Sequence, residues 1–131
     1  MEAKYQDATT NRPEGDRILD APFVFTDIGK FSTQLKEEEA WKKNDRNWIT
    51  VYKTDDLTIV LTWLHKGAMI MDNVLDGLAI VQVLEGTIEF SVENGCTELH
   101  EKQLITIHAG IMHTVKALKD SLIIITTKGE S

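Results

Sequence analysis

The sequence predicts an all-β protein of one domain, on the evidence of three observations. From Trp48 onward, short runs rich in β-branched and aromatic residues follow one another at the close spacing of a β-sandwich or barrel. Turn-forming stretches such as TDD, DG, EG and ENG separate these runs. The chain has 131 residues, of which 42% are hydrophobic and 27% charged, which suits a globular domain with a single core.

Residues 1–45 are expected to form a segment of their own before the β domain. Residues 1–22 are mostly polar and contain NRPEGDR, which is typical of a mobile arm. The stretch APFVFTDI, residues 21–28, has enough apolar and β-favouring residues for a short strand on the edge of a sheet. The stretch TQLKEEEAWKK, residues 33–43, is rich in helix formers and predicts a short helix or turn.

Residues 46–131 form the predicted β domain. Its expected strands, in chain order, are NWITVYK, LTIVLTWLH, LAIVQVLE, TIEFSVE, TELH, QLITIHA, MHTVKAL and SLIIITT. Asn94 and Gly95 predict a tight hairpin of type I′, because that turn needs a positive φ at both central residues. Gly86 stands between two apolar strands and Gly110 repeats the arrangement, and a residue without Cβ reverses the chain easily there.

The longest runs, LAIVQVL and SLIIIT, are almost wholly apolar, so both faces of these strands should be covered. A second sheet of the same chain covers one face. A second copy of the chain is a natural cover for the other face, and the sequence therefore predicts a homodimer. Whether residues 1–22 exchange between the two copies stays open.

Charge and composition exclude several partners. A net charge of -7 without a Lys or Arg cluster opposes nucleic-acid binding, which requires neutralised phosphates. The amino-terminal residues lack the apolar segment of a signal peptide, and no run reaches the length of a membrane span, so a cytoplasmic protein is expected. Cys96 is the single cysteine, which excludes an intramolecular disulfide and a site of four thiolates.

Two glycine-spaced stretches resemble the two motifs of the cupin superfamily. The first motif runs Gly, five residues, His-x-His, three or four residues, Glu, six residues, Gly. The second runs Gly, five residues, Pro-x-Gly, two residues, His, three residues, Asn. The first motif maps onto Gly67, Asn73, Leu75, Ala79 and Gly86, and the second onto Lys102, His108, Gly110, His113 and Ala117.

Fifteen residues lie between Gly86 and Lys102, which is the short distance of small bacterial cupins. The resemblance covers about residues 48–127. It implies a small, single-domain, RmlC-like cupin with a jelly-roll barrel, the double-stranded β-helix, in which two sheets enclose a ligand cavity. Of the second motif, only Gly110 and His113 match.

In metal-binding cupins, the two His and the Glu of the first motif and the His of the second hold the ion. Here Leu75 and Ala79 have no donor atom, Asn73 offers a neutral amide, and His113 is the one imidazole left. Transition-metal sites generally need three good ligands, so we expect no metal and no cofactor. The alternative is a site rebuilt from displaced residues. The candidates are His65, His108, Asp72 and Asp76; in the simpler interpretation the aspartates are turn residues, and His65 and His100 are surface histidines.

The family pattern implies that Ala79 faces the barrel interior, so strand alternation turns Val81 and Val83 inward too. The predicted interior is then apolar apart from His113, an arrangement common in ligand pockets. We therefore predict binding of a small, partly apolar molecule, and we assign no catalytic residue. The predicted ligand-binding residues are His113, Asn73, Trp63, Leu75, Ala79, Val81 and Met112.

Other interpretations stay open. His113 could instead be a buried histidine bonded to a backbone carbonyl, and Trp63 could be plain core. The protein could be an enzyme, either an oxygenase with displaced metal ligands or a metal-free isomerase that uses His113 as acid or base. It could also be a non-catalytic structural or interaction module whose side chains fill the barrel.

Overall fold

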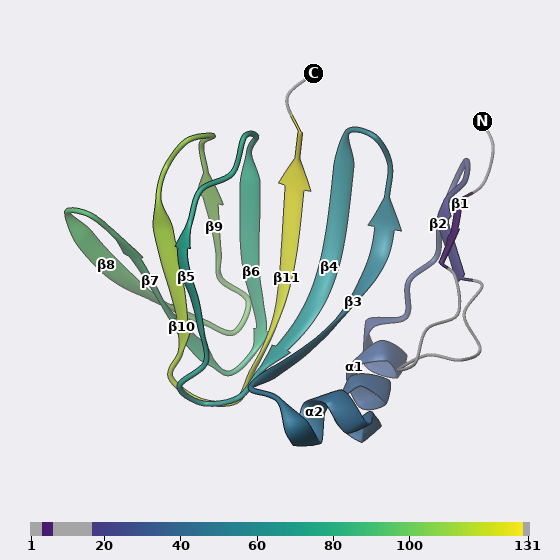
Figure 1. Ribbon diagram of the computed structural model, residues 1–131, viewed down its shortest axis with the longest axis horizontal. Helices are drawn as coiled ribbons and strands as arrows, with labels where there is room; N and C mark the ends of the chain where they lie inside the picture. Colours follow the sequence, from purple (N-terminus) through teal and green to yellow (C-terminus); the bar gives the residue numbers. More distant parts are fainter. Residues whose placement is uncertain (1–3, 7–16, 130–131) are drawn as a thin grey trace.

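Most of the chain folds into two antiparallel β-sheets that face one another (Figure 1). The computed structural model describes residues 4–6 and 17–129. One sheet has four strands in the order β5-β10-β7-β8, and the other has five in the order β3-β4-β11-β6-β9. The strands are β3 (Arg46–Lys53), β4 (Leu57–Leu64), β5 (Met69–Asn73), β6 (Ala79–Glu85), β7 (Thr87–Val92), β8 (Gly95–His100), β9 (Leu104–Ile107), β10 (His113–Ala117) and β11 (Ser121–Lys128). The predicted all-β jelly roll is confirmed.

The space between the two sheets holds the first of two hydrophobic clusters, called here the barrel core. Along β6 the buried residues Ala79, Val81 and Val83 alternate with more exposed ones, as the period of two requires. Their partners across the barrel come from β7 and β10. The buried members are Leu64, Ala68, Ala79, Val81, Val83, Ile88, Phe90, Leu99, Ile107, Val115, Ala117 and Ile123.

The second cluster, called here the helix core, lies between the five-stranded sheet and two short helices, α1 (Ile28–Glu37) and α2 (Glu39–Lys43). Leu35 of α1 is fully buried there and Trp41 of α2 nearly so. Its strand residues are Ile49 and Val51 of β3, Leu61 and Trp63 of β4, and Leu122 of β11. The chain's own helices thus cover the outer face over β3, β4 and β11. Of the two runs for which the sequence suggested a second copy as cover, this includes SLIIIT in β11 but not most of LAIVQVL in β6.

The helices begin and end at identifiable residues. Asp27 caps α1, because its side chain accepts a hydrogen bond from the backbone N of Lys30 at 3.1 Å. Glu38 has extended backbone angles and separates α1 from α2. The predicted helix over residues 33–43 is therefore confirmed in kind, although it starts five residues earlier and consists of two pieces. Neither helix is long or apolar enough to cross a membrane.

Other predictions for residues 1–45 fail or fall partly outside the described residues. Residues 21–27 form no strand, so the predicted edge strand over 21–28 is wrong. A two-stranded sheet forms instead from β1 (Lys4–Gln6) and β2 (Arg17–Asp20). The rest of the predicted arm, residues 1–3 and 7–16, lies outside the described residues.

The hairpin between β7 and β8 forms where predicted, but for a different reason. Val92 pairs with Gly95, so the two turn residues are Glu93 and Asn94. Lys102 is the one non-glycine residue with a positive φ in the described part of the chain, and Gly95 has no positive φ either. The prediction of a type I′ turn centred on Asn94 and Gly95 is therefore wrong.

The glycines of the two motif-like stretches do hold the chain in turns. Gly67, Gly86 and Gly110 have φ of 91°, 88° and 80°, a region that strains residues with a Cβ. At Gly86 a Cβ would also lie 2.3 Å from the Ser121 Oγ. Gly86 is thus fixed by both conformation and space.

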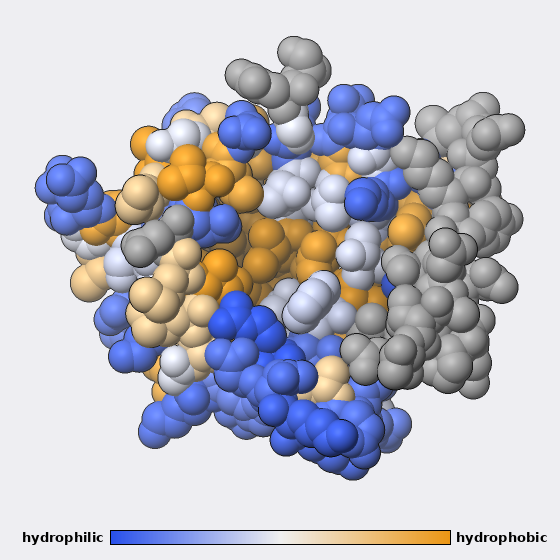
Figure 2. All heavy atoms as spheres, in the orientation of Figure 1, coloured by the Kyte–Doolittle hydropathy of each residue, from blue (hydrophilic) through white to orange (hydrophobic). Residues whose placement is uncertain are grey.

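One side of the barrel is more open than the other. β3 and β5 are edge strands of different sheets, and Figure 2 shows a hollow with a hydrophobic floor on the face of the molecule where they lie. At the end of this opening, Arg46 Nη2 donates a hydrogen bond to the backbone O of Met69 at 2.7 Å and so links the two edges. Arg46 also hydrogen-bonds Asp45, which lowers the pKa of that carboxyl below its usual value.

Candidate functional site

His113 and Asn73 lie side by side at one end of the barrel. β10 begins at His113 and β5 ends at Asn73, and the two residues are partners in the antiparallel register of these strands. Residues directly opposite in such a pair share a face of the sheet. His113 is 4% exposed, and Asn73 is half-buried. The two polar anchors predicted from sequence are therefore neighbours.

The His113 ring is held in one orientation. Its Nδ1 lies 2.9 Å from the backbone O of Ile111, and a carbonyl oxygen can only accept, so Nδ1 carries the proton. The ring also stacks on Phe90 of the barrel core, with centroids 5.5 Å apart. Nε2 makes no hydrogen bond within the described part of the chain. In the neutral ring, Nε2 therefore offers a lone pair to a bound molecule.

A pocket of about 510 Å³ opens beside His113, where β7 ends and β10 begins. This volume lies in the range of pockets that hold small ligands. Its lining residues are Ser91, Val92, Glu93, Met112, His113 and Thr114. His113 and Met112 were predicted from sequence, whereas Ser91, Val92, Glu93 and Thr114 were missed. Ser91 could have been found as the cross-strand partner of Thr114, but only once the β7–β10 register is known.

Three further predicted residues belong to the barrel interior. Ala79 and Val81 are buried members of the barrel core, and Leu75 is half-buried and packs against it. The backbone N of Gly110 donates to the backbone O of Leu75 at 2.9 Å. This bond joins the turn of the first motif-like stretch to that of the second and brings the predicted wall close to the start of β10.

Trp63 does not lie with these residues. It faces the helices on the other side of the five-stranded sheet, where its Nε1 donates to the backbone O of Ser32 at 3.0 Å. Its ring packs near Trp41, and the Lys36 Nζ lies 4.0 Å from its centroid. The prediction that Trp63 belongs to the pocket wall is therefore wrong. Trp63 is a core residue, which was the alternative interpretation of the sequence.

The displaced candidates for a metal site do not converge on His113. His65 follows β4 at the opposite end of the barrel, where it is half-buried and stacks on Trp41 rather than lying free on the surface. His108 and Asp76 are exposed. The Asp72 side chain lies outside the described part of the structure. Among the described residues, no three His, Cys, Asp or Glu side chains gather as metal ligands would.

The family's four metal-ligand positions thus carry one imidazole, one amide and two hydrocarbon side chains. His113 Nδ1 is already bonded to Ile111, which leaves one ring nitrogen. Transition metals in proteins are generally held by at least three imidazole, thiolate or carboxylate ligands. The residues at these positions therefore do not fit such an ion.

Searches with known families and curated sequences find no match for this chain. Solved structures do match it. A cupin superfamily protein from Desulfitobacterium hafniense has a TM-score of 0.68 and 12% identity, over 86% of this chain and 95% of that one. An RmlC-like cupin from Shewanella frigidimarina has a TM-score of 0.62 and 16% identity, over 66% and 78%. A conserved protein of unknown function from Streptococcus pyogenes has a TM-score of 0.65 and 20% identity, over 86% and 92%. The protein therefore has the fold of the small, RmlC-like cupins.

Proposed function

We propose that the protein binds a small, partly apolar molecule at the His113 end of the barrel, without a metal ion. The observation that carries this proposal is the state of the His113 ring. It is buried, oriented by Ile111 and stacked on Phe90, while its Nε2 stays without a protein partner among the described residues. A polar atom that is fixed in this way and borders a pocket is suited to orient a ligand.

The neighbouring residues give the ligand its expected chemistry. Asn73 adds an amide that can both donate and accept, next to His113 in the register. Leu75 and Met112 add apolar surface, since Leu75 packs on the barrel core and Met112 lines the pocket with 57% of its surface exposed. The preferred ligand is therefore an apolar body with one or two hydrogen-bonding groups.

Native mass spectrometry of tag-free protein tests this proposal. The wild-type protein should carry a small molecule that is released on denaturation, and no stoichiometric iron, manganese, nickel or zinc. His113→Gln should lose the molecule, because the amide cannot reproduce the oriented ring. The matched control is His108→Gln, which changes an exposed histidine five residues away and should keep it. Stoichiometric metal, or a molecule retained by His113→Gln, would contradict the proposal.

A metal-free enzyme is the second candidate, and one observation favours it. The pocket beside His113 is also lined by Glu93, so an imidazole and a carboxylate border the same space. Such a pair can move a proton on and off a bound molecule. In this proposal, His113 Nε2 takes the proton as general base and Glu93 assists.

Deuterium exchange separates the two candidates. The co-purified molecule is incubated with the protein in D2O, and its mass is then measured by mass spectrometry. Proton abstraction from carbon would add deuterium with the wild-type protein, and Glu93→Gln would slow this while retaining the molecule. If no deuterium enters above the protein-free rate, the enzyme is excluded and binding remains.

A further inference from the structure

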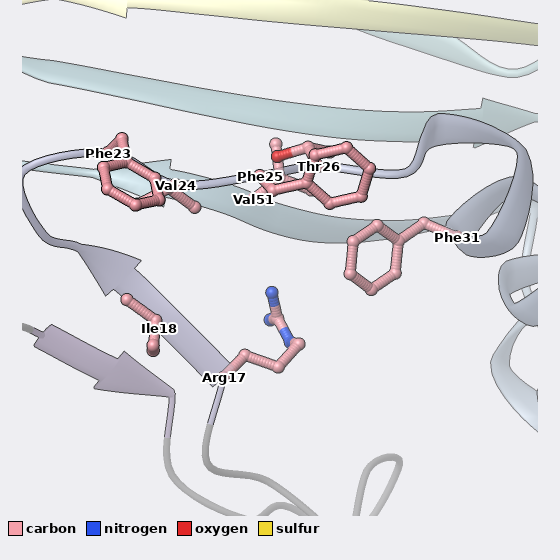
Figure 3. Close-up of a pocket in the computed structure, with 8 residues that line it drawn as sticks. All are labelled: Arg17, Ile18, Phe23, Val24, Phe25, Thr26, Phe31 and Val51. Carbon is pink, nitrogen blue, oxygen red and sulfur yellow. The ribbon is translucent and has the colours of Figure 1, made fainter.

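Residues 23–26 run along the molecule as a strand without a sheet. Figure 3 shows the backbone passing nearly straight from Phe23 to Thr26, ahead of α1. None of these residues belongs to a strand, and in the described part of the chain residues 21–26 make no backbone hydrogen bond. Their N–H and C=O groups are therefore available to another strand.

The side chains of this segment alternate as those of a strand do. Val24 and Thr26 are half-buried and face the molecule, whereas Phe23 and Phe25 are each 86% exposed. Large apolar side chains are rarely left so exposed at alternate positions of one segment, and such a patch marks an interaction surface. The segment thus has a face for its own chain and a face for a partner.

The two phenylalanines themselves line part of a pocket of about 390 Å³ (Figure 3). It is mostly apolar, with Phe31 of α1 and Val51 of β3 among its walls. Of the described residues that line it, Arg17 alone is charged, and its guanidinium donates to the backbone O of Thr50 and lies 5.7 Å from the Phe31 ring centroid. One surface therefore carries both protruding aromatic rings and an apolar recess.

We propose that this surface binds a second copy of the chain. A two-fold interface presents the same patch on both sides. A patch that has both protruding side chains and a recess can therefore be complementary to itself. Phe23 and Phe25 of each copy would enter the recess of the other, and the unpaired backbone of residues 23–26 would gain hydrogen bonds as an added strand does.

Area and charge both favour this partner. A buried aromatic side chain covers about 150–250 Å², so the two phenylalanines supply roughly 300–500 Å² of the ~800 Å² per partner of a stable interface. Ile18, which is 45% exposed, lines the same pocket and adds to this area. The stretch APFVFT, residues 21–26, has no charge in a chain of net charge -7, so its side chains add nothing to the repulsion between two acidic copies.

Sedimentation velocity at about 50 µM protein tests the proposal. Wild-type protein should sediment as a species of twice the 14.8 kDa protomer mass. The double variant Phe23→Ser, Phe25→Ser should sediment at the protomer mass with an unchanged circular dichroism spectrum. The control variant is Met71→Ser, Leu104→Ser, which removes two other exposed apolar side chains (64% and 55%) and should stay dimeric.

Amide hydrogen exchange of the wild-type protein gives a second test that does not depend on a variant. Residues 23–26 should be protected at high protein concentration and exchange rapidly after dilution below the dissociation constant. A wild-type protomer mass would overturn the proposal. A dimer that survives in the phenylalanine variant, or fast exchange of residues 23–26 in a dimer, would place the interface elsewhere and overturn it as well.

Discussion

The imidazole of His65 stacks on the indole of Trp41, with ring centroids 3.3 Å apart and planes inclined by 12°. Its Nε2 lies 2.8 Å from the backbone O of Trp41, so this nitrogen carries a proton and donates it. Asp120 lies on the other side, with its Oδ1 3.8 Å from Nδ1. His65 therefore ties α2 to the end of β4.

Replacing His65 should weaken this contact between α2 and the end of β4. We expect His65→Ala to lower the free energy of unfolding by about 2 kcal/mol, since it removes one hydrogen bond and one ring stack. Urea denaturation at pH 7 measures this. His108→Ala, at an exposed turn position, should change it by less than ~0.5 kcal/mol. Equal effects of the two changes would show that the stacked pair contributes nothing to stability.

The two glycines of the first motif-like stretch should differ in their tolerance of alanine. At Gly67, φ is 91° but a Cβ would meet no atom within 4 Å, so Gly67→Ala should cost only the backbone strain of about 1–2 kcal/mol. At Gly86 the same strain is joined by contacts of 2.3 Å to Ser121 Oγ and 2.6 Å to the Asp120 O. Gly86→Ala should therefore cost about 3–4 kcal/mol. Thermal unfolding of both variants gives the order, and a reversed order would refute the close approach at Gly86.

Trp63→Phe separates a structural role from a role in ligand binding. Loss of the Nε1 donor leaves the Ser32 carbonyl without its bond and the helix core underfilled. We expect the free energy of unfolding to fall by about 1–3 kcal/mol. The mass of any co-purified molecule should not change. A variant of wild-type stability that loses the molecule would return Trp63 to the pocket wall.

The Asp45–Arg46 pair should make the free energy of unfolding depend on pH, with lower stability in acid. The hydrogen bond from Arg46 holds the folded-state pKa of Asp45 below its unfolded value of about 4. The ionised carboxylate therefore contributes stability above that pH, and the contribution is lost as pH falls through the folded-state pKa. The effect is small because Asp45 is largely solvated.

Arg46→Met should raise the pKa of Asp45 towards its usual value, as followed by NMR titration of the carboxyl carbon. Lys43→Met is the control, because Lys43 pairs with Glu39 rather than with Asp45. An Asp45 pKa that stays low in Arg46→Met would assign the shift to other groups.

The strands were predictable because their apolar runs are long and bounded by turn residues. Every run quoted from residue 47 onward became a strand within a few residues of the expected ends. β5 was missed, although its residues MIMDN lie inside the first motif-like stretch. Its signal is weak because Met69 and Met71 stay exposed at a sheet edge and a register shift interrupts the alternation.

The site was predictable where the position of a residue along a strand decides whether its side chain faces the barrel interior. Ala79, Val81 and His113 follow from a period of two once one inward residue is assumed. The prediction for Trp63 failed because β4 carries apolar residues on both faces, and no local pattern indicates which face packs against a helix. Glu93 could not be found, because it enters the pocket only through the β7–β8 turn, whose position was misjudged by one residue.

The helix core makes the amino-terminal segment part of the barrel's own folding unit. Five of its seven buried members belong to strands β3, β4 and β11, and the other two, Leu35 and Trp41, come from the helices. Removal of residues 1–45 would uncover the indole of Trp63 and the side chain of Leu122 together. Helices and sheets should therefore melt in a single cooperative transition, and a chain that begins at Arg46 should not fold by itself.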